Sequence, residues 1–600
     1  MSLPPLANLL ALHDPDPLAL ERVAADLASG GEFDEVWRPA PAWIAAIAPL
    51  PGGDVDGEAT RQHGLAFAEG RFAVGRAERA ASMVDSRPEG LAALSGDFAF
   101  MRFHPDGAAT VVRSCGGLVP FYLWQAERRA CVATRLTDLV RHLPDEPRLD
   151  PLINAVWTTG HGVFPDHRTF IAGVSILGRG CFARLDPPDA PRVRQYWDPR
   201  PSRLERPTPQ RTTEHAERLR ALLIENLARD LDPQDGNLLT LSGGVDSSSL
   251  AALATRVASR PIWTWSLLPE SDDLFRHEMS YIGPLLEHCR VLRSWVVRFG
   301  AASRLELLRV APRLAFQIVH PALCALPGIL REAPVRVLFG GEFADEVCGS
   351  VFTLPDWAAA TSLAALIRGL GRLPFGRRDV LRWVKHYLQR LTLRPGLPFP
   401  ADLPAFVLPE LRIEYRDWLE RRRRDAARDD RPHGYLALRA EGDGFVAMNW
   451  EAASTLGVRR SFPFFNREVL ELAFQCHPAE LVGPGPKKLL RTALRRDVPP
   501  VNLERADRGR LGSDFMSAKH SRAHPLPEGL RPIVRAEWFR PFRSLEHGEA
   551  HGLEQLELFV SSLALHRHRV RHHFSRTRGA MYDWGTQTIA RSEGSRPQAI

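Results

Sequence analysis

The stretch 238–250 constrains the fold of this chain more than any other. It begins with an apolar run typical of a buried parallel strand, turns at Gly243 and Gly244, and continues at Leu250 into residues that form helices well. Adjacent glycines let the backbone approach a pyrophosphate, and the N–H groups that start a helix favour negative charge. Asp246 is placed to hold Mg²⁺ between phosphate oxygens, because hard cations take oxygen ligands. The stretch predicts a strand, a phosphate-binding loop and a helix.

This loop lacks the lysine and the glycine spacing of the usual P-loop, which excludes that class of phosphate site. Its sequence Ser-Gly-Gly-Val-Asp-Ser, residues 242–247, resembles instead the PP-loop of ATP pyrophosphatases, which cleave ATP between the α and β phosphates and transfer AMP. The resemblance implies ATP and Mg²⁺ as cofactors. The nucleotide-binding residues that it implies here are Leu241, Ser242, Gly243, Gly244, Val245, Asp246 and Ser247. The alternative is an ordinary glycine turn before a helix.

Length and charge set broad limits. With 600 residues the chain is too long for one hydrophobic core, so two domains are expected and three are possible. The formal net charge of +7 is compatible with a nucleic acid, an anionic nucleotide or an acidic peptide as partner. The richness in arginine, alanine and proline is also what a GC-rich genome produces, so the charge alone selects none of these partners.

The cysteines and the apolar runs bear on the compartment. Seven cysteines are scattered without a Cys-x-x-Cys pair, which argues against a disulfide framework or a zinc site and fits a reducing cytoplasm. No secretory signal is visible, and no apolar run is long enough to span a bilayer. We therefore expect a soluble cytoplasmic protein.

Residues 1–200 show short alternating segments separated by glycine and proline, which predicts a β-rich domain. Three of its segments, Leu-Ser-Gly-Asp-Phe-Ala at 94–99, Thr-Phe-Ile-Ala-Gly-Val at 169–174 and Tyr-Trp-Asp at 196–198, resemble the N-terminal glutaminase-like domain of class B asparagine synthetases. That resemblance implies a β-rich sandwich of the Ntn type.

One departure concerns the chemistry of this domain. The glutaminases of that family use a cysteine directly after the initiator methionine, and its freed α-amine serves as the base. Here the position is occupied by Ser2. We interpret residues 1–200 as a degenerate glutaminase-like domain with a structural or peptide-binding role, and we do not expect glutamine to donate nitrogen.

A proline-rich linker, 201–212, separates this domain from residues 213–575. An amphipathic helix at 213–223 leads to the phosphate loop, and further strands are predicted at 261–268 and 293–297. Alternating strands and helices predict a doubly wound α/β domain that binds its ligand at the carboxyl ends of the strands. Residues 355–445 add a basic helical region, and 576–600 is expected to be a flexible tail.

A second motif lies at 335–349, where a predicted strand is followed by a glycine turn with three carboxylates. It resembles the Ser-Gly-Glu-Gly-Ala-Asp-Glu-Val-Phe-Gly-Gly segment of asparagine synthetases. The resemblance implies that Asp345 binds Mg²⁺ together with Asp246, that Glu342 is the acid/base group near the acyl-adenylate, and that Gly341 meets the adenine. The family comparison also assigns Leu267 to the nucleotide site. The alternative is a capped helix start with acidic residues in its first turn.

A third motif, Pro-Lys-Lys-Leu-Leu-Arg at 486–491, resembles the Lys-x-Leu-Leu-Arg of the same family. Lys487 takes the position of the catalytic lysine, with Lys488 as the alternative. Its role would be to neutralise charge that develops on the α-phosphate and the departing pyrophosphate. Arg505 begins a match to the closing Arg-x-Asp-Lys-x-Gly segment. The alternative for the lysine is a solvated position at a helix start.

The segment 457–466 departs from its counterpart in the family. Arg459 replaces an acidic residue, Ser461 replaces an arginine, and Asn466 replaces an aspartate. We take this segment to face the substrate, and the change from acid to base is hard to reconcile with binding free aspartate.

These motifs together predict an enzyme that adenylates a carboxylate with ATP and Mg²⁺ and lets an amine displace AMP, which yields an amide. Family members without the N-terminal cysteine include β-lactam synthetases and lasso-peptide macrolactam cyclases. The sequences at 341–346, 462–467 and 483–488 look most like the cyclases, which adenylate an Asp or Glu side chain of a precursor peptide. The peptide's N-terminal amine then closes the ring.

The partners implied are the precursor peptide, a leader peptidase and a leader-binding protein, with no nucleic acid and no membrane. Three alternatives remain. One is a β-lactam synthetase-like enzyme that acts on a small molecule, one is a PP-loop enzyme that modifies tRNA, and one is an inactive scaffold.

Overall fold

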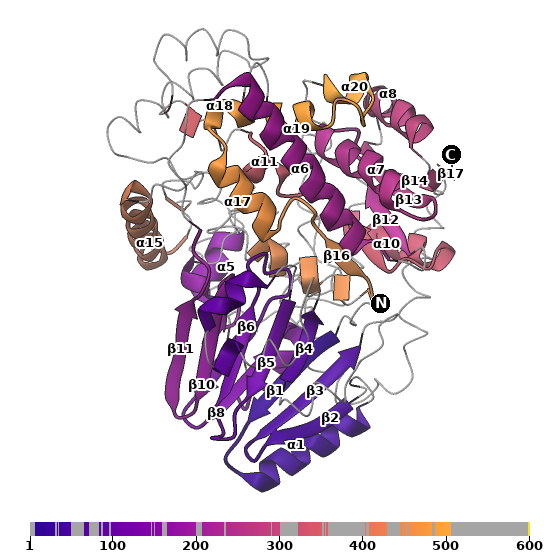
Figure 1. Ribbon diagram of the computed structural model, residues 1–600. Coiled ribbons are helices and arrows are strands. Elements are labelled where there is room, and N and C mark those ends of the chain that lie inside the picture. Colours follow the sequence, from indigo (N-terminus) through magenta and orange to yellow (C-terminus); the bar gives the residue numbers. More distant parts are fainter. Residues whose placement is uncertain are drawn as a thin grey trace.

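A computed structural model of the chain shows a mixed α/β protein, which confirms the predicted fold class at that level (Figure 1). The part of the chain that the structure describes comprises residues 7–30, 33, 35–49, 65–70, 83–85, 88–94, 98–145, 147–148, 150–158, 165–199, 207–232, 236–269, 271–289, 291–299, 322–350, 353, 356–357, 360, 402–403, 407–428, 444–447, 449–451, 453–454, 456–482, 486–505 and 598–599.

The N-terminal region contains two antiparallel sheets. The first has the order β2-β3-β1-β8-β7-β9 and the second β11-β10-β6-β5-β4. The strands of the first are β1 (Ala7–His13), β2 (Glu35–Ala40), β3 (Trp43–Pro49), β7 (Tyr122–Ala126), β8 (Arg129–Ala133) and β9 (Val174–Ile176). The strands of the second are β4 (Leu65–Gly70), β5 (Phe98–Phe103), β6 (Ala109–Arg113), β10 (Cys181–Asp186) and β11 (Asp189–Gln195). The prediction of a β-rich region is thus confirmed, although the segment 169–174 reaches a strand only at Val174, where β9 begins.

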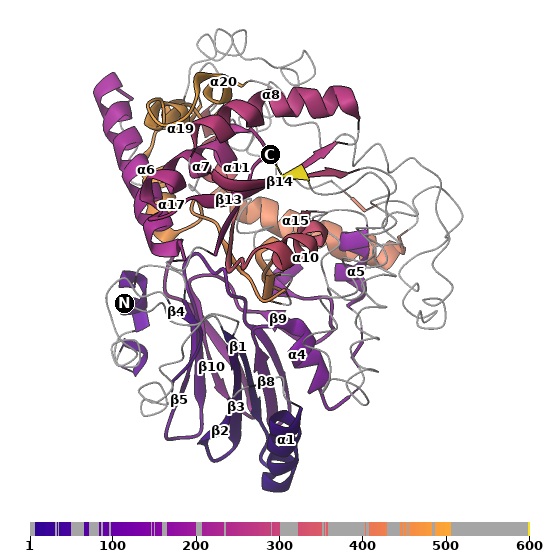
Figure 2. The same ribbon diagram turned by 90° about the vertical axis from the view of Figure 1, so that its right-hand side faces the viewer.

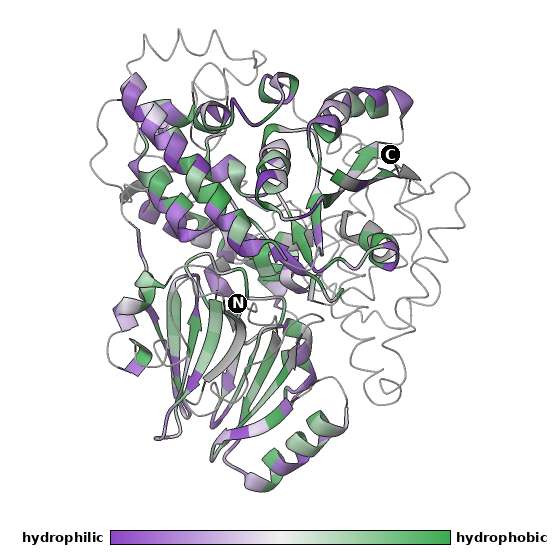
Figure 3. Cartoon of the chain, turned by 45° about the vertical axis from the view of Figure 1, so that its right-hand side comes forward, coloured by the Kyte–Doolittle hydropathy of each residue, from purple (hydrophilic) through white to green (hydrophobic). Residues whose placement is uncertain are grey.

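The two sheets share one hydrophobic core. Leu9 and Ala11 of β1 pack in the same cluster as Met101 of β5 and Val111 of β6, whereas Leu10 points to the opposite face of the first sheet. Because successive side chains of a strand point to opposite faces, one strand supplies two separate cores. Hydrophobic residues accordingly run along the strands of both sheets (Figure 3).

The third sheet forms the centre of the C-terminal region and has the order β16-β15-β12-β13-β14-β17. Its strands are β12 (Asn237–Thr240), β13 (Ile262–Pro269), β14 (Val291–Phe299), β15 (Val337–Phe339), β16 (Arg459–Ser461) and β17 (Gln598–Ala599). All neighbouring pairs are parallel except β14 with β17. The chain proceeds from β12 to β13 and β14 on one side and then returns to β15 on the other. This reversal creates a topological switch point between β12 and β15, which is where open α/β sheets bind ligands.

Helices cover both faces of this sheet (Figures 1 and 2). Leu239 of β12 packs with Leu253 of the following helix, whereas Leu238 on the other face packs with Leu326 and Ile329. The helices are α1 (Pro17–Ser29), α4 (Leu136–Arg141), α5 (Pro151–Thr158), α6 (Pro209–Asp230), α7 (Val245–Val257), α8 (Asp272–His288), α10 (Ala322–Glu332), α11 (Ala344–Val347), α15 (Pro409–Arg428), α17 (Arg467–Gln475), α18 (Pro478–Leu481), α19 (Lys488–Ala493) and α20 (Pro500–Leu503), with 3-10 turns at Pro88–Ala93 and Pro165–His167.

Helix α6 begins at Pro209, inside the predicted linker, 201–212. Pro209 occupies its first turn and the Thr208 side chain accepts a hydrogen bond from the backbone N–H of Arg211, which is the capping that a proline and a threonine favour at this position. Of the predicted basic region 355–445, α15 is the main described element. The predicted tail 576–600 lies outside the described residues except for β17. No helix in the described ranges is long and apolar enough to cross a membrane.

A buried carboxylate joins the N-terminal region to the C-terminal region. Glu451 accepts a hydrogen bond from the backbone N–H of Leu136, the first residue of α4. Burial raises the pKa of Glu451 to about 8, despite the opposing charge of Arg135. The charged form is disfavoured because the carboxylate is removed from water.

We expect Glu451→Gln to reduce the loss of stability at alkaline pH. A carboxyl group whose pKa is raised on folding binds its proton more tightly in the folded state, so stability falls as pH rises from about 4.5 to about 8. Glutamine keeps an oxygen acceptor for Leu136 and does not ionise. The free energy of unfolding of the variant, relative to that of the wild type, should be about 2–4 kcal/mol higher at pH 9 than at pH 5. Urea unfolding at both pH values measures this, and an unchanged difference between the two proteins would contradict it.

Candidate functional site

The loop between β12 and α7 is organised by its own serines. The backbone N–H of Ser242 donates to Oγ of Ser247 over 3.1 Å, and the two hydroxyl oxygens lie 3.0 Å apart. Gly243 has φ +67°, a left-handed conformation that glycine adopts without strain. Gly244 is the N-cap of α7, so the first N–H groups of that helix are directed into the loop. The predicted strand, loop and helix are all present.

The second motif lies directly against this loop. A Cβ atom on Gly341 would be 3.0 Å from Cβ of Asp246 and 3.1 Å from the backbone nitrogen of Ser247. A larger residue would therefore force the two segments apart. Phe343 has φ +69° at the N-cap of α11, and this turn brings Asp345 into the first turn of that helix. The two glycine turns meet at the switch point of the sheet.

Lys487 joins the two motifs. Its ammonium forms ion pairs with the carboxylate of Asp246 and with Oδ1 of Asp345, the latter at 2.8 Å. The lysine has φ +61° at the N-cap of α19, and its backbone N–H donates to the carbonyl of Gly349 over 2.9 Å. Lys488, the alternative, instead donates to the backbone carbonyl of Ala479. The structure therefore brings Asp246, Asp345 and Lys487 together and leaves Lys488 outside.

The charges of these three groups are interdependent. The Lys487 side chain is 9% exposed, whereas those of Asp246 and Asp345 are 24% and 45% exposed. Burial, together with the like charge of Asp345, raises the pKa of Asp246, although Lys487 acts in the opposite direction. Burial alone would lower the pKa of Lys487, but the two carboxylates outweigh it and raise that pKa. The lysine therefore stays protonated.

The same carboxylates fit a divalent cation. Oδ1 of Asp246 is buried and has no hydrogen-bond partner among the described residues, and Asp345 is half-exposed beside it. Two carboxylates that converge on one point, with an unused oxygen, supply the hard ligands that Mg²⁺ takes, the remaining positions being filled by phosphate oxygens or water. The residues present thus fit the predicted Mg²⁺ site.

Glu342 lies on the other side of the second motif and is paired with Arg460. Nη2 of Arg460 donates to Oε1 of Glu342 over 2.6 Å, and the guanidinium stacks on the Phe462 ring at 4.8 Å. A Cβ on Gly340 would be 1.7 Å from Oε2 of Glu342, so glycine at this position makes room for the carboxylate. Nε of Arg460 and Oε2 of Glu342 have no hydrogen-bond partner in the described ranges.

The apolar residues assigned to the nucleotide site have buried side chains. Leu241 and Val245 belong to the core on the α7 face of the sheet, and Leu267 belongs to the core on the α10 face, near the carboxyl end of β13. Leu241 donates its backbone N–H to the carbonyl of Trp265 over 2.8 Å. These residues can reach a nucleotide mainly through their backbone.

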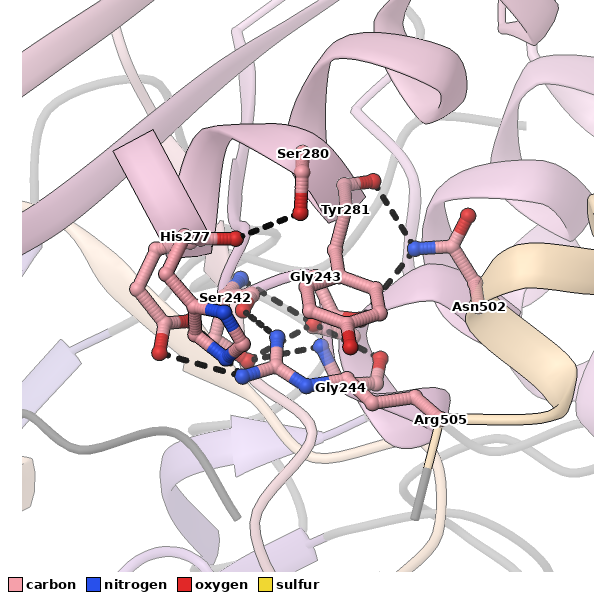
Figure 4. A network of polar contacts seen from close by, with 10 residues as sticks. Ser242, Gly243, Gly244, His277, Ser280, Tyr281, Asn502 and Arg505 are labelled. Carbon is pink, nitrogen blue, oxygen red and sulfur yellow. Dashed lines mark hydrogen bonds and ion pairs between the residues drawn. The ribbon is translucent and has the colours of Figure 1, made fainter. Parts of the chain in front are cut away.

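Three polar side chains to which the sequence analysis gave no role surround the outside of the phosphate loop (Figure 4). Arg505 donates to the carbonyl of Ser242, Asn502 donates to the carbonyl of Gly243, and Glu278 forms a two-pronged ion pair with Arg505. The family match that begins at Arg505 was the one available signal for this group. Glu278 and Asn502 carried none.

The expectation that Arg459 and Ser461 face the substrate is wrong. Arg459 donates to the backbone carbonyl of Asp230 at the end of α6, and Ser461 donates to the Asp230 carboxylate. Alternation along β16 turns these two residues toward α6 and Arg460 toward Glu342. Asn466 accepts from the backbone N–H of Val469 as the N-cap of α17. The departures from the family segment are therefore structural at these positions.

Comparison with known proteins points to one family. The sequence profile described as asparagine synthase matches residues 218–536, more than half of the chain. Proteins of Mycobacterium bovis and Mycobacterium tuberculosis that carry the provisional name asparagine synthetase (glutamine-hydrolysing) are 27% identical over 243 residues. The match covers 39% of this chain and 36% of theirs, so the chain spans about a third of the length of the curated relatives it matches.

We expect Lys487→Met to destabilise the folded chain in a pH-dependent way. Methionine retains the volume but leaves two carboxylates without their cation, which should cost about 2 kcal/mol at pH 8. The cost should shrink at pH 5, because burial raises the pKa of Asp246 and favours its neutral form. Added Mg²⁺ should restore part of the loss by binding the folded state. Thermal unfolding at both pH values, with and without Mg²⁺, measures these effects.

Lys488→Met is the matched control, because its ammonium contacts only the carbonyl of Ala479 among the described residues. Added Mg²⁺ should change the stability of Lys488→Met by no more than it changes the stability of the wild type. Equal losses for Lys487→Met at both pH values, unaffected by Mg²⁺, would show that this lysine acts through packing alone.

Proposed function

The chain belongs to the asparagine synthase family, and from that premise we propose that it closes a macrolactam ring in a precursor peptide. Family membership implies an ATP-dependent ligase that forms carbon–nitrogen bonds. In the proposed reaction a side-chain carboxylate of the peptide attacks the α-phosphorus of ATP and releases pyrophosphate. The peptide's N-terminal amine then attacks the acyl carbon of the adenylate and releases AMP, which leaves an amide.

The observation that carries this proposal is the convergence of Asp246, Asp345 and Lys487 at the switch point of the sheet. Each residue comes from a different segment, and all three lie where the first N–H groups of α7 are directed into the phosphate loop. This combination supplies a site for a polyphosphate, oxygen ligands for a divalent cation and one buried ammonium.

The roles of the residues follow from their charges. The loop N–H groups bind phosphate oxygens, and Lys487 stabilises negative charge as pyrophosphate departs. Mg²⁺, held by Asp246 and Asp345, would supply further neutralisation of the phosphates when bound. We assign to Glu342 the role of accepting the proton of the attacking amine; the hydrogen bond from Arg460 to its carboxylate supports this role by orienting that group.

A substrate with a carboxylate is supported by Arg460. Its guanidinium is fixed by one ion pair and by stacking on Phe462, and its Nε lacks a partner in the described part of the chain. A planar guanidinium is suited to binding a carboxylate, and this Nε is buried beside Glu342. The peptide nature of the substrate, and a leader peptidase and leader-binding protein as partners, rest on the resemblance of 341–346 and 462–467 to lasso-peptide cyclases.

The alternative is an amide synthetase of the β-lactam synthetase type that acts on a small molecule. The same ATP site and the same Glu342–Arg460 pair would serve it. An enzyme that modifies tRNA has less support, because a nucleic-acid substrate gives no role to a paired glutamate and arginine beside the phosphate loop.

Product analysis tests the proposal. The protein is incubated with Mg-ATP and a leaderless candidate precursor peptide, and the nucleotide products and the peptide mass are measured. AMP and pyrophosphate, together with loss of one water from the peptide, are the expected result. AMP without loss of mass would favour an intermolecular amine and the small-molecule alternative. ADP, or no turnover with any carboxylate, would exclude adenylation.

Two variants test the assignment of the residues. Asp246→Ala should abolish ATP–pyrophosphate exchange, at least about a 10²-fold loss, because it removes a phosphate-site cation ligand. Ser2→Ala should leave the exchange and the peptide product unchanged, because we assign Ser2 no role as a nucleophile. Residue 2 lies outside the described residues, so this expectation rests on the sequence. A loss of product in Ser2→Ala would overturn the interpretation of residues 1–200 as a degenerate glutaminase.

A further inference from the structure

Two carbonyl groups of the phosphate loop are bound from outside the nucleotide site. Nη1 of Arg505 donates to the carbonyl of Ser242 over 3.2 Å, and Nδ2 of Asn502 donates to the carbonyl of Gly243 over 3.1 Å. The same Asn502 amide donates to the carbonyl of Tyr281 on α8 over 2.9 Å. The consecutive carbonyls of Ser242 and Gly243 are thus both held on the side of the loop where Arg505 and Asn502 lie (Figure 4).

Arg505 is itself held rigidly. Nη2 donates to both carboxylate oxygens of Glu278 at 3.0 and 2.9 Å, and the guanidinium lies 4.0 Å from the centroid of the Tyr281 ring. The side chains of Arg505 and Glu278 are 2% and 4% exposed. A pair this deeply buried is costly to desolvate, and removing one partner leaves an uncompensated charge. Its position next to a ligand-binding loop therefore requires an explanation.

The explanation is that a phosphate-binding loop must present its N–H groups and keep its carbonyls turned away. A phosphate is bound by N–H groups, and a carbonyl turned toward it would repel it. Gly243 can adopt many backbone conformations, so the sequence of the loop does not by itself select the one that presents its N–H groups. Donors placed behind the carbonyls select it. Packing does the same, because a Cβ on Gly243 would be 2.8 Å from Cβ of Tyr281.

We propose that Glu278, Asn502 and Arg505 are positioning residues that hold the phosphate loop in its pyrophosphate-binding conformation. Arg505 donates a hydrogen bond to the Ser242 carbonyl, and Asn502 donates one to the Gly243 carbonyl. Glu278 neutralises and orients the guanidinium of Arg505. This inference rests on the proposed function in one respect, namely that the loop binds the β and γ phosphates of ATP. It assigns a purpose to helices α8 and α20 and to Arg505, which the reaction itself does not use.

The test compares nucleotides with and without the terminal phosphates. Binding of α,β-methylene ATP with Mg²⁺, and of AMP, is measured by calorimetry on the full chain. Arg505→Lys keeps a charge but cannot reproduce the planar fork that reaches Glu278 and Ser242 together. It should raise Kd for the triphosphate analogue by about 10-fold or more, the size expected for a lost hydrogen bond to a charged group. Kd for AMP should change by less than about 3-fold, since AMP lacks the phosphates that the loop binds.

A second variant and a control complete the design. Asn502→Ala introduces no charge and should produce the same selective loss if Arg505→Lys fails to fold. Arg276→Lys is the control. Arg276 lies on α8, as Glu278 does, but its side chain is 70% exposed and pairs with Asp273 at the surface. This variant should bind both nucleotides as the wild type does.

The outcomes distinguish a failure of the positioning role from a failure of the proposed function. A selective loss for the triphosphate analogue in Arg505→Lys or Asn502→Ala supports the positioning role. Equal binding by these variants and by Arg276→Lys overturns it and leaves adenylation intact. Parallel weakening of AMP and the triphosphate analogue also overturns it, because a general structural defect would act on both. If the wild type binds no triphosphate analogue, the proposed function falls and the inference falls with it.

Discussion

The ammonium of Lys487 between two carboxylates is the interaction on which the architecture of the site depends. Asp246 belongs to the helix after β12, Asp345 to the helix after β15, and the lysine to the start of α19. Without the lysine the two carboxylates would repel each other, so its positive charge makes their approach possible. Gly341 favours the approach, because a Cβ there would lie only 3.0 Å from Cβ of Asp246 and would press the two turns apart. A charge triad and one missing side chain thus bring three distant segments to one point.

Compensation of buried charge recurs around this point. Arg505 is matched by Glu278 behind the phosphate loop, and Arg460 is matched by Glu342 at its side. In both pairs an arginine acts on the geometry of a neighbour and keeps its own charge balanced. Both terminal nitrogens of Arg505 are engaged, Nη1 by Ser242 and Nη2 by Glu278, whereas Nε of Arg460 and Oε2 of Glu342 have no hydrogen-bond partner among the described residues. The pair behind the loop is therefore the more completely bonded of the two.

Local patterns allowed much of this to be predicted. The glycine turns after two apolar runs predicted both loops, and short alternating segments predicted that residues 1–200 are rich in strands. What the sequence could not supply is the partner of each polar side chain. Glu278 carried no signal of a role in the sequence, whereas packing of α8 against the loop buries it beside Arg505. Such pairings depend on contacts across more than two hundred residues, 278 to 505, for which spacing and propensity carry no signal.

The same limit explains the misjudged segment at β16. A reversed charge at Arg459 and a lost charge at Ser461 suggested an altered substrate surface, but both side chains interact with Asp230 at the end of α6. Arg459 there meets a backbone carbonyl at the end of a helix, where positive charge is favourable. A strand alternates its faces, so the residue between them, Arg460, is the one that reaches the site. Arg460 lies beside Glu342, and its Nε has no hydrogen-bond partner in the described part of the chain, so it is the residue of this strand whose side chain pairs with the second motif.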